Sequence, residues 1–392
     1  MKILIMKTKS LILTTLCVVF LLFSACETPL APPVKKDTTR LWPAADSTGK
    51  NVGFINEKGE MVIPAQYKYA NFFSNGMAKV STFDYKIQFI DTEGNVVYTL
   101  PEGESSEAYF VNGFLKFYKY IPPTWSIAPK YGLYDSNFNP VIPDKFLQLG
   151  NMSKEGLVAT EAGYYNKKGE LALTFNTDTF DMSTVTGTTY TYGDFCDGIA
   201  VIHVSHYVNG RIYNGVGAIN TKGEWVIDTT TYRDLLSIGG GLIAYMDSTI
   251  LWGLMDTHGN KVTEPVFEII GGIEDNDLIP VCYNLGRGWG YVDKTGATRI
   301  APKYYYCKPF HEGVAWVSNV DDYYSLIDTE GNVLLDLDRG VQPMSVCHNG
   351  LMLVADHINS KNKYIDKNNN IIYSWDRKNV YSFTPSLLMP AR

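Results

Sequence analysis

Three short segments of the chain contain residue types that bind metal ions. Residues 366–370 (Asp-Lys-Asn-Asn-Asn) alternate like a calcium loop but lack its glycine and its distant glutamate. Residues 274–277 (Glu-Asp-Asn-Asp) offer oxygen ligands for a divalent cation, although such an acidic run is also typical of a solvated loop. His203 and His206 are three residues apart, so on a strand their rings point to opposite faces. We expect neither a metal site nor a cofactor.

The sequence lacks the patterns that accompany nucleophilic or phosphate chemistry. Its six histidines are scattered, and no Gly-x-Ser-x-Gly segment places a serine on a sharp strand-to-helix turn. Residues 286–290 (Gly-Arg-Gly-Trp-Gly) resemble a phosphate loop, but no Lys-Ser/Thr pair directly follows their last glycine and no helix is expected after them. We predict that the protein is not an enzyme, with a hydrolase-type activity on the loops as the alternative.

Aromatic side chains outside the regular pattern are candidates for ligand contacts. Trp125 lies in an insertion beside two prolines, Tyr192 ends a stretch rich in threonine and tyrosine, and Tyr305 is the middle of three consecutive tyrosines. Consecutive strand residues point to opposite faces, so part of this tyrosine run must face solvent. Rigid aromatic groups serve as stacking platforms for sugars and peptides. We predict binding through Trp125, Tyr192 and Tyr305, with ordinary packing as the alternative.

The first 26 residues predict export and lipid attachment. Three lysines within residues 1–10 precede the apolar run 11–23, which is too short to span a bilayer and is typical of a secretory signal. Residues 22–26 (Leu-Phe-Ser-Ala-Cys) resemble the bacterial lipoprotein box, in which a cysteine after small residues is acylated and becomes the new amino terminus. This resemblance implies that Cys26 carries acyl chains such as palmitate. An ordinary secretory signal is the alternative.

The chain is expected to have three parts. Residues 1–25 form the signal peptide, residues 26–39 the acylated cysteine with a proline-rich tether, and residues 40–392 the folded repeat body. Two acyl chains hold a protein stably on a membrane. We therefore expect a lipoprotein on the extracytoplasmic side of a bacterial envelope, at the outer membrane in a Gram-negative cell.

Four cysteines of the expected body show no Cys-x-x-Cys spacing: Cys196, Cys282, Cys307 and Cys347. Each lies in or beside an expected strand, so we predict free buried thiols, with disulfides in an oxidising compartment as the alternative.

A unit of about 36 residues recurs along the body, and a period of this size decides the fold. An asparagine or aspartate marks each of nine copies: Asn56, Asp91, Asp135, Asn166, Asn220, Asp256, Asp293, Asp328 and Asp366. A glycine stands three residues later in seven copies, among them Gly59, Gly94, Gly223, Gly259, Gly296 and Gly331. Two copies begin with an unaltered Trp-Gly pair, Trp252-Gly253 and Trp289-Gly290.

Each part of the unit has a structural interpretation. Asn or Asp at the first position of a type I turn accepts hydrogen bonds from the backbone beyond it, and glycine tolerates the positive φ that completes a bulged hairpin. The strand at 252–256 has apolar groups on both faces, so we expect it to be buried on both sides, and we place Trp289 in the core. The glycine of the Trp-Gly pair implies that a neighbouring backbone or aromatic ring approaches closely. A second block, Phe-x-x-Gly-x-Ala-x-Val/Ile at 73–80, 195–202 and 310–317, supplies another strand.

The composite pattern Trp/Tyr-Gly-x-x-Asp-x-x-Gly, Ile-x-Pro and Phe-x-x-Gly-x-Ala-x-Val resembles the bacterial WG repeat over residues 51–373. This resemblance implies an all-β, propeller-like array on secreted or surface proteins and is nearly silent about activity. Three copies have Gln88, Ser325 or Lys363 in place of the glycine. We expect those units to pack more loosely or to lie at a seam.

We predict an all-β body of about nine units, as a closed propeller-like ring in preference to an open superhelical array. Closure protects strand edges that would otherwise pair with other chains. The first copy lacks an upstream Phe-x-x-Gly block unless residues 40–42 serve, and the last copy lacks a downstream one. We expect these terminal partial units to complete a shared blade.

Composition and charge exclude some classes of function. With 45% hydrophobic residues the chain can bury a large core, and 34 basic against 41 acidic residues give a net charge of −7. The basic footprint of a nucleic-acid-binding protein is therefore missing. We predict a non-catalytic binding or scaffolding module whose partners are the membrane, through the lipid on Cys26, and an envelope protein or glycan. An enzyme on the repeat loops and a purely structural envelope protein are the alternatives.

Overall fold

The computed structural model describes residues 40–119, 128–174, 187–208, 211–274, 276–283, 288–319 and 323–377. The chain divides into two compact units, Met1–Lys36 and Asp37–Arg392, and every described residue belongs to the second. The elements there are the strands β1 to β33, which form nine antiparallel sheets that we call blades 1 to 9 in chain order. The predicted all-β class is confirmed. In these described ranges no helix is long and apolar enough to cross a membrane.

Three blades have three strands and six have four, and consecutive strands are always neighbours in the sheet. The three-stranded blades are blade 1 with β1 (Trp42–Ala45), β2 (Val52–Ile55) and β3 (Met61–Tyr67), blade 4 with β12 (Leu157–Thr160), β13 (Gly163–Asn166) and β14 (Leu171–Leu173), and blade 6 with β19 (Asp234–Gly239), β20 (Leu242–Met246) and β21 (Trp252–Asp256).

Three of the four-stranded blades precede blade 6. They are blade 2 with β4 (Tyr69–Ala70), β5 (Ala78–Ser81), β6 (Ile87–Ile90) and β7 (Val96–Thr99), blade 3 with β8 (Glu104–Ser106), β9 (Phe114–Lys119), β10 (Lys130–Asp135) and β11 (Pro140–Phe146), and blade 5 with β15 (Gly187–Tyr192), β16 (Ile199–Val208), β17 (Arg211–Asn220) and β18 (Trp225–Tyr232).

The other three four-stranded blades follow blade 6. They are blade 7 with β22 (Ile269–Ile270), β23 (Ile279–Cys282), β24 (Trp289–Val292) and β25 (Thr298–Tyr304), blade 8 with β26 (Tyr306–Cys307), β27 (Val314–Ser318), β28 (Tyr324–Asp328) and β29 (Val333–Asp336), and blade 9 with β30 (Val341–Pro343), β31 (Leu351–Asp356), β32 (Lys361–Asp366) and β33 (Ile371–Asp376).

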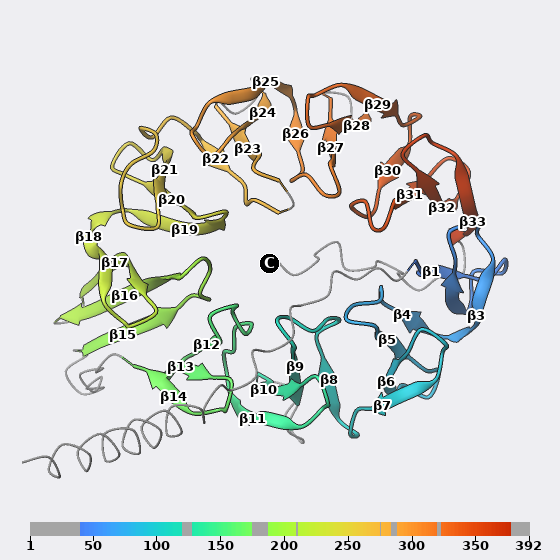
Figure 1. The fold of residues 1–392 in the computed structure, drawn as a ribbon, viewed down its shortest axis with the longest axis horizontal. Helices are drawn as coiled ribbons and strands as arrows, with labels where there is room; N and C mark the ends of the chain where they lie inside the picture. Colours follow the sequence, from blue (N-terminus) through green and yellow to red (C-terminus); the bar gives the residue numbers. More distant parts are fainter. Residues whose placement is uncertain are drawn as a thin grey trace, which may run out of the picture. The chain divides into compact units, whose positions relative to one another are not determined.

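The nine blades of the second unit succeed one another around a closed ring, in which blade 9 meets blade 1 (Figure 1). The Tyr364 hydroxyl donates a hydrogen bond to the Pro43 carbonyl at 2.9 Å, and Trp42 Nε1 donates to the His348 carbonyl at 2.8 Å. The predicted closed ring is confirmed and the open array is excluded. The expected shared blade is wrong, because β1 gives blade 1 its own first strand and side chains, rather than paired strands, join the two ends.

Contacts between successive blades explain the composite sequence pattern. In several blades, the residue that follows the glycine of the Trp-Gly pair, or its equivalent, packs against a phenylalanine of the next blade. This phenylalanine is the first residue of the Phe-x-x-Gly block. Ring centroids are 4.9 Å apart for Phe54 and Phe73, 4.7 Å for Tyr164 and Phe195, and 4.8 Å for Tyr291 and Phe310. Each aromatic pair removes apolar surface of two blades from water, which holds neighbouring blades together.

The close approach predicted at the Trp-Gly glycines is confirmed. A Cβ atom added at Gly253 would lie 2.7 Å from the Tyr245 ring, and one at Gly290 would lie 2.5 Å from the Ile300 carbonyl oxygen. Where the glycine is missing, a polar side chain bonds within the sheet instead, as Gln88 does with Thr99 at 3.2 Å. Ser325 bonds Asp336 and Lys363 bonds Asp356 in the same way. The adjacent residues Phe89, Leu326 and Tyr364 remain buried, so the expectation of looser packing there is wrong.

Trp289 is only half-buried, which corrects its expected place in the core. It starts β24, and its ring meets Tyr306 edge-on at 5.3 Å. The fully buried residues of this strand are Tyr291 and Val292, and Trp289 packs against the edge of the core cluster that contains Tyr291.

Candidate binding surface

The asparagine and aspartate residues that mark the repeats hold hairpin turns. In every copy the side-chain oxygen accepts hydrogen bonds from the backbone N–H groups two and four residues later. For Asp293 the donors are Thr295 at 2.8 Å and Ala297 at 3.1 Å. The residue three positions later has a positive φ in all nine copies, including Gly296 at 80°. The predicted turn is confirmed, and the Asn and Asp side chains stabilise it through these hydrogen bonds.

The segments that resembled metal sites have other partners. Residues 366–370 form one of these turns, in which the Asn370 side chain also donates to Asp366 at 2.9 Å. Asp277 pairs with Lys294 at 2.7 Å, and His206 contacts the Thr188 hydroxyl at 2.9 Å. Within the described ranges no group of three or more His, Cys, Asp or Glu side chains is placed to hold a metal ion.

The four cysteines of the body are free thiols, and Cys282, Cys307 and Cys347 are buried. Burial raises the pKa of the Cys307 and Cys347 thiols to about 12, so both stay protonated at neutral pH.

The three aromatic residues predicted to bind a ligand have different positions. Trp125, like Cys26, lies outside the described residues. Tyr192 is half-buried in β15, where its ring meets Tyr164 at 5.4 Å, so it lies within a blade. The reason is that residues 187–192 continue the sheet by pairing with β16. Tyr305 is 59% exposed beside the buried Tyr304, so among these three only Tyr305 is seen to face solvent.

A set of loops that sequence reasoning missed displays large apolar side chains. We call them the tip loops; each connects the strand of the Phe-x-x-Gly block to the Trp-Gly strand of the same blade, and the fully described ones are 46–51, 82–86, 161–162, 247–251 and 357–360. Because all blades have the same strand order, these loops recur at equivalent positions on one face of the ring. Exposed apolar residues on them are Phe83, Tyr85, Ile250 and Ile358.

Blade 5 extends this feature, because its hairpin of β16 and β17 has ten residues in each strand. Val208, Ile212 and Tyr213 are exposed at the end of this hairpin. The apolar side chains are therefore not confined to a single blade.

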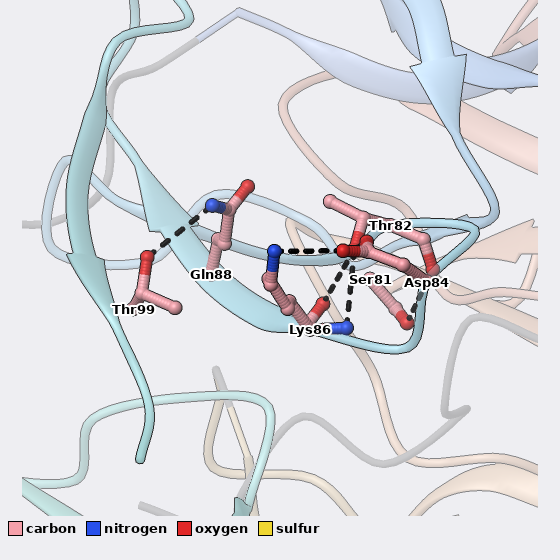
Figure 2. A network of polar contacts seen from close by, with 6 residues as sticks. All are labelled: Ser81, Thr82, Asp84, Lys86, Gln88 and Thr99. Carbon is pink, nitrogen blue, oxygen red and sulfur yellow. Dashed lines mark hydrogen bonds and ion pairs between the residues drawn. The ribbon is translucent and has the colours of Figure 1, made fainter. Parts of the chain in front are cut away.

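The tip loop of blade 2 is held by its own polar groups (Figure 2). The backbone N–H of Thr82 donates to the Lys86 carbonyl at 3.0 Å, and that of Tyr85 donates to the Thr82 carbonyl at 3.1 Å. The Thr82 hydroxyl bonds Asp84, and Lys86 Nζ lies 2.8 Å from the Asp84 carboxylate. The ammonium of Lys86 keeps the pKa of Asp84 below its ordinary value. The loop is thus an ordered turn that leaves Phe83 and Tyr85 exposed.

A lysine partly covers the most exposed of these rings. Lys68 Nζ lies 4.0 Å from the ring centroid of Tyr85, which is a cation–π contact. In the sequence, the signal for this surface is an apolar residue set between Thr, Asp and Lys in a loop that otherwise reads as polar.

Comparison with known proteins supports the repeat assignment. Three segments, residues 53–84, 252–284 and 289–324, match the family model described as the WG containing repeat, so the predicted WG repeats are confirmed. The comparison with curated proteins gives no match.

Solved structures show a likeness of fold. The chain is similar to a structure described as a eukaryotic initiation factor, with a TM-score of 0.57, 12% identity, and coverage of 88% of this chain and 100% of that chain. It also matches BamB from Moraxella catarrhalis with a TM-score of 0.36 and 9% identity, over 79% of this chain and 87% of that one. At these identities the first likeness concerns the fold alone.

Proposed function

We propose that this WG-repeat β-propeller is a non-catalytic binding or scaffolding module of the bacterial envelope, held at the membrane by lipid on Cys26. Its ligand is a protein or glycan that contacts the face carrying the tip loops. The observation that carries this proposal is that equivalent loops of different blades expose large apolar side chains.

The arrangement of the apolar residues supports binding over packing. The blade interfaces are already filled by buried aromatic pairs, so the tip loops are not needed to complete the core. Loops on a rigid scaffold are common binding sites, and an ordered loop loses little entropy when a partner docks. An enzyme on the loops and a purely structural protein remain the competing proposals.

The proposed membrane address rests on the sequence. A basic segment, a short apolar run and the lipoprotein box precede a proline-rich stretch, and the compact second unit begins at Asp37, near the expected end of the tether. Replacing Cys26 by alanine is expected to move the protein from the detergent phase to the aqueous phase in a phase-partition assay. Unchanged partition would refute the lipid anchor and leave the binding proposal standing.

The binding proposal is tested with this soluble Cys26→Ala chain as bait. A tip variant with Phe83, Tyr85, Ile250 and Ile358 changed to serine is compared with a perimeter variant in which Val62, Val97, Leu171 and Val333, exposed on outer strands, are changed to serine. The bait is offered solubilised envelope proteins and purified cell-wall glycan, and captured molecules are purified and titrated back.

We expect the tip variant to lose at least tenfold in affinity while the perimeter variant binds like the parent chain, with both variants melting near the parent temperature. Equal binding by the two variants would contradict the tip-loop surface. Turnover of a captured molecule would favour the enzyme, and capture of nothing would favour the structural protein.

A further inference from the structure

Two tip loops place bulky side chains at a backbone position that the rest of the chain reserves mainly for glycine. In the repeat turn of blade 2, Gly94 has φ 86° and its N–H bonds the carbonyl three residues earlier at 3.0 Å. Tyr85 has φ 64° with the same bond at 3.1 Å, and Ile250 has φ 66° with the same bond at 3.2 Å. In the tip loop of blade 1 this position is held by Gly49, at φ 69°.

This left-handed conformation is unfavourable for residues with a Cβ atom. The Cβ crowds the following carbonyl oxygen, and a β-branched side chain such as that of Ile250 makes the crowding worse. Glycine would adopt the same turn without strain. A bulky residue persists at such a position only when its side chain does something that offsets the cost.

Packing supplies that offset at Phe138 but not in the two tip loops. Phe138 also has a positive φ, of 61°, but it is 7% exposed and stacks on Tyr98 with ring centroids 4.1 Å apart. Tyr85 is 74% exposed and Ile250 is 58% exposed. Neither side chain belongs to a core cluster, so burial within this chain does not account for either one.

We infer that Tyr85 and Ile250 are the anchor residues of the binding surface, and that they insert into apolar pockets of a protein partner. This inference rests on the proposed function and names the chemistry of its partner.

The polar groups of the two loops favour a protein over a glycan. Thr82, Asp84 and Lys86 bond one another, and the Asp247 carboxylate accepts both the backbone N–H and the hydroxyl of Thr249. A hydroxyl-rich sugar would need these donors and acceptors for itself, whereas an apolar pocket needs only the exposed side chains.

The carboxylates favour a protein over a lipid surface. Asp84 is one residue from Tyr85, and Asp247 is three residues from Ile250. A hydrogen bond from Lys86 keeps the pKa of Asp84 below its ordinary value, and hydrogen bonds from Thr249 do the same for Asp247. Inserting the side chains into hydrocarbon would bring these charges towards a medium that cannot solvate them. An apolar pocket on a protein leaves these carboxylates at its solvent-accessible rim, where Asp84 keeps its pairing with Lys86.

The test uses a phage-displayed library of random 12-residue peptides, selected on the Cys26→Ala chain. We expect enriched peptides to be rich in aromatic or aliphatic residues. Each synthetic peptide should bind either Tyr85→Gly or Ile250→Gly at least tenfold more weakly than the parent chain, and a peptide that depends on Tyr85 should bind Tyr85→Phe like the parent. Both glycine variants should melt at or above the parent temperature, because glycine relieves the strain.

The matched control is Ile371→Ser, since Ile371 is 57% exposed but lies on the outer strand β33, away from the tip loops, and has an ordinary φ. We expect this variant to bind like the parent chain. If the tip variant loses binding and the glycine variants retain it, the anchor assignment is wrong while the tip-loop function stands.

Other outcomes overturn the inference in separate ways. A several-degree fall in melting temperature with unchanged binding in Tyr85→Gly would show that the ring is structural. Sedimentation with phosphatidylethanolamine–phosphatidylglycerol vesicles that depends on Tyr85 would assign the loops to lipid. If selection enriches no peptide and the tip variant captures the same molecules as the parent, both the inference and the proposed function fail.

Discussion

At the scale of single residues, buried tyrosine hydroxyls link some of the blades to the next one. Tyr164 donates to the Gly193 carbonyl at 2.7 Å, and Tyr291 donates to the Lys308 carbonyl at 2.6 Å. Both acceptors belong to the segment that enters the following blade. Burial raises the pKa of Tyr291 far above its ordinary value, so its hydroxyl remains a donor throughout the physiological range.

Tyr291→Phe should therefore lower the free energy of unfolding by about 1–3 kcal/mol, because it leaves the Lys308 carbonyl buried without this donor while preserving the ring. Tyr305→Phe, at an exposed position, should change it by less than about 0.5 kcal/mol. Urea denaturation of the two variants measures the difference. Equal, small changes would show that the hydroxyl contributes nothing to the blade interface.

At the scale of elements, the repeat turns pair one amide with one carboxylate. Where the turn begins with Asn, a Glu follows four residues later and accepts its amide N–H, as Glu224 does from Asn220 at 2.8 Å. In five of the turns that begin with Asp, an Asn follows and donates to it, as Asn260 does to Asp256 at 2.9 Å. The two arrangements are equivalent, and each avoids placing two carboxylates side by side.

The carboxylate of an Asp turn should make the stability of the protein depend on pH. The hydrogen bond from the Asn260 side chain lowers the pKa of Asp256 below its ordinary 3.8, and hydrogen bonds from backbone N–H groups lower it further. A group with a depressed folded-state pKa stabilises the protein above its unfolded value and loses that contribution as pH falls through the folded value. Asp256→Asn should therefore reduce the stability lost between pH 6 and pH 2.5.

Asn220→Asp is the matched opposite change, because it sets a second carboxylate beside Glu224. This variant should be less stable than the parent at pH 7 and recover towards it near pH 4, where carboxylates begin to protonate. Guanidinium denaturation across this pH range tests both variants. Parallel pH profiles for the two would contradict the pairing rule.

At the scale of the whole ring, closure depends on aromatic side chains that connect the two ends of the body. Trp42 is fully buried, and Tyr373 of blade 9 donates to the Ala45 carbonyl of blade 1 at 3.0 Å. One core cluster contains Trp42 together with Leu353, Tyr364 and Trp375. The last contact of the ring is therefore a packed interface in which no strand is shared.

Trp42→Ala should destabilise the protein by about 3–5 kcal/mol, since it removes a fully buried ring and a hydrogen bond at the closing interface. Trp225→Ala is the control, because Trp225 is 40% exposed on β18 and its loss should cost much less. Denaturant titration gives both values. Similar losses for the two variants would mean that the closing interface contributes little to stability.

The local features of this protein follow from its sequence alone. Turn residues such as Asp293 and Gly296 act within five positions of the chain, and the Trp-Gly glycine indicates a close approach by an adjacent strand of the same sheet. These short-range constraints repeat nine times, which is why the period, the all-β class and the hairpin turns were predictable without coordinates.

Tertiary structure decided what depends on neighbours that are distant in sequence. Closure joins Trp42 to His348, and only the assembled ring shows that Tyr192 packs between blades while Tyr305 faces solvent. The left-handed backbone of Tyr85 and Ile250, and their exposure, are also invisible in the sequence, where both residues resemble ordinary strand formers. Burial is a property of the space around a side chain, and in a ring most of that space is supplied by the adjacent blades.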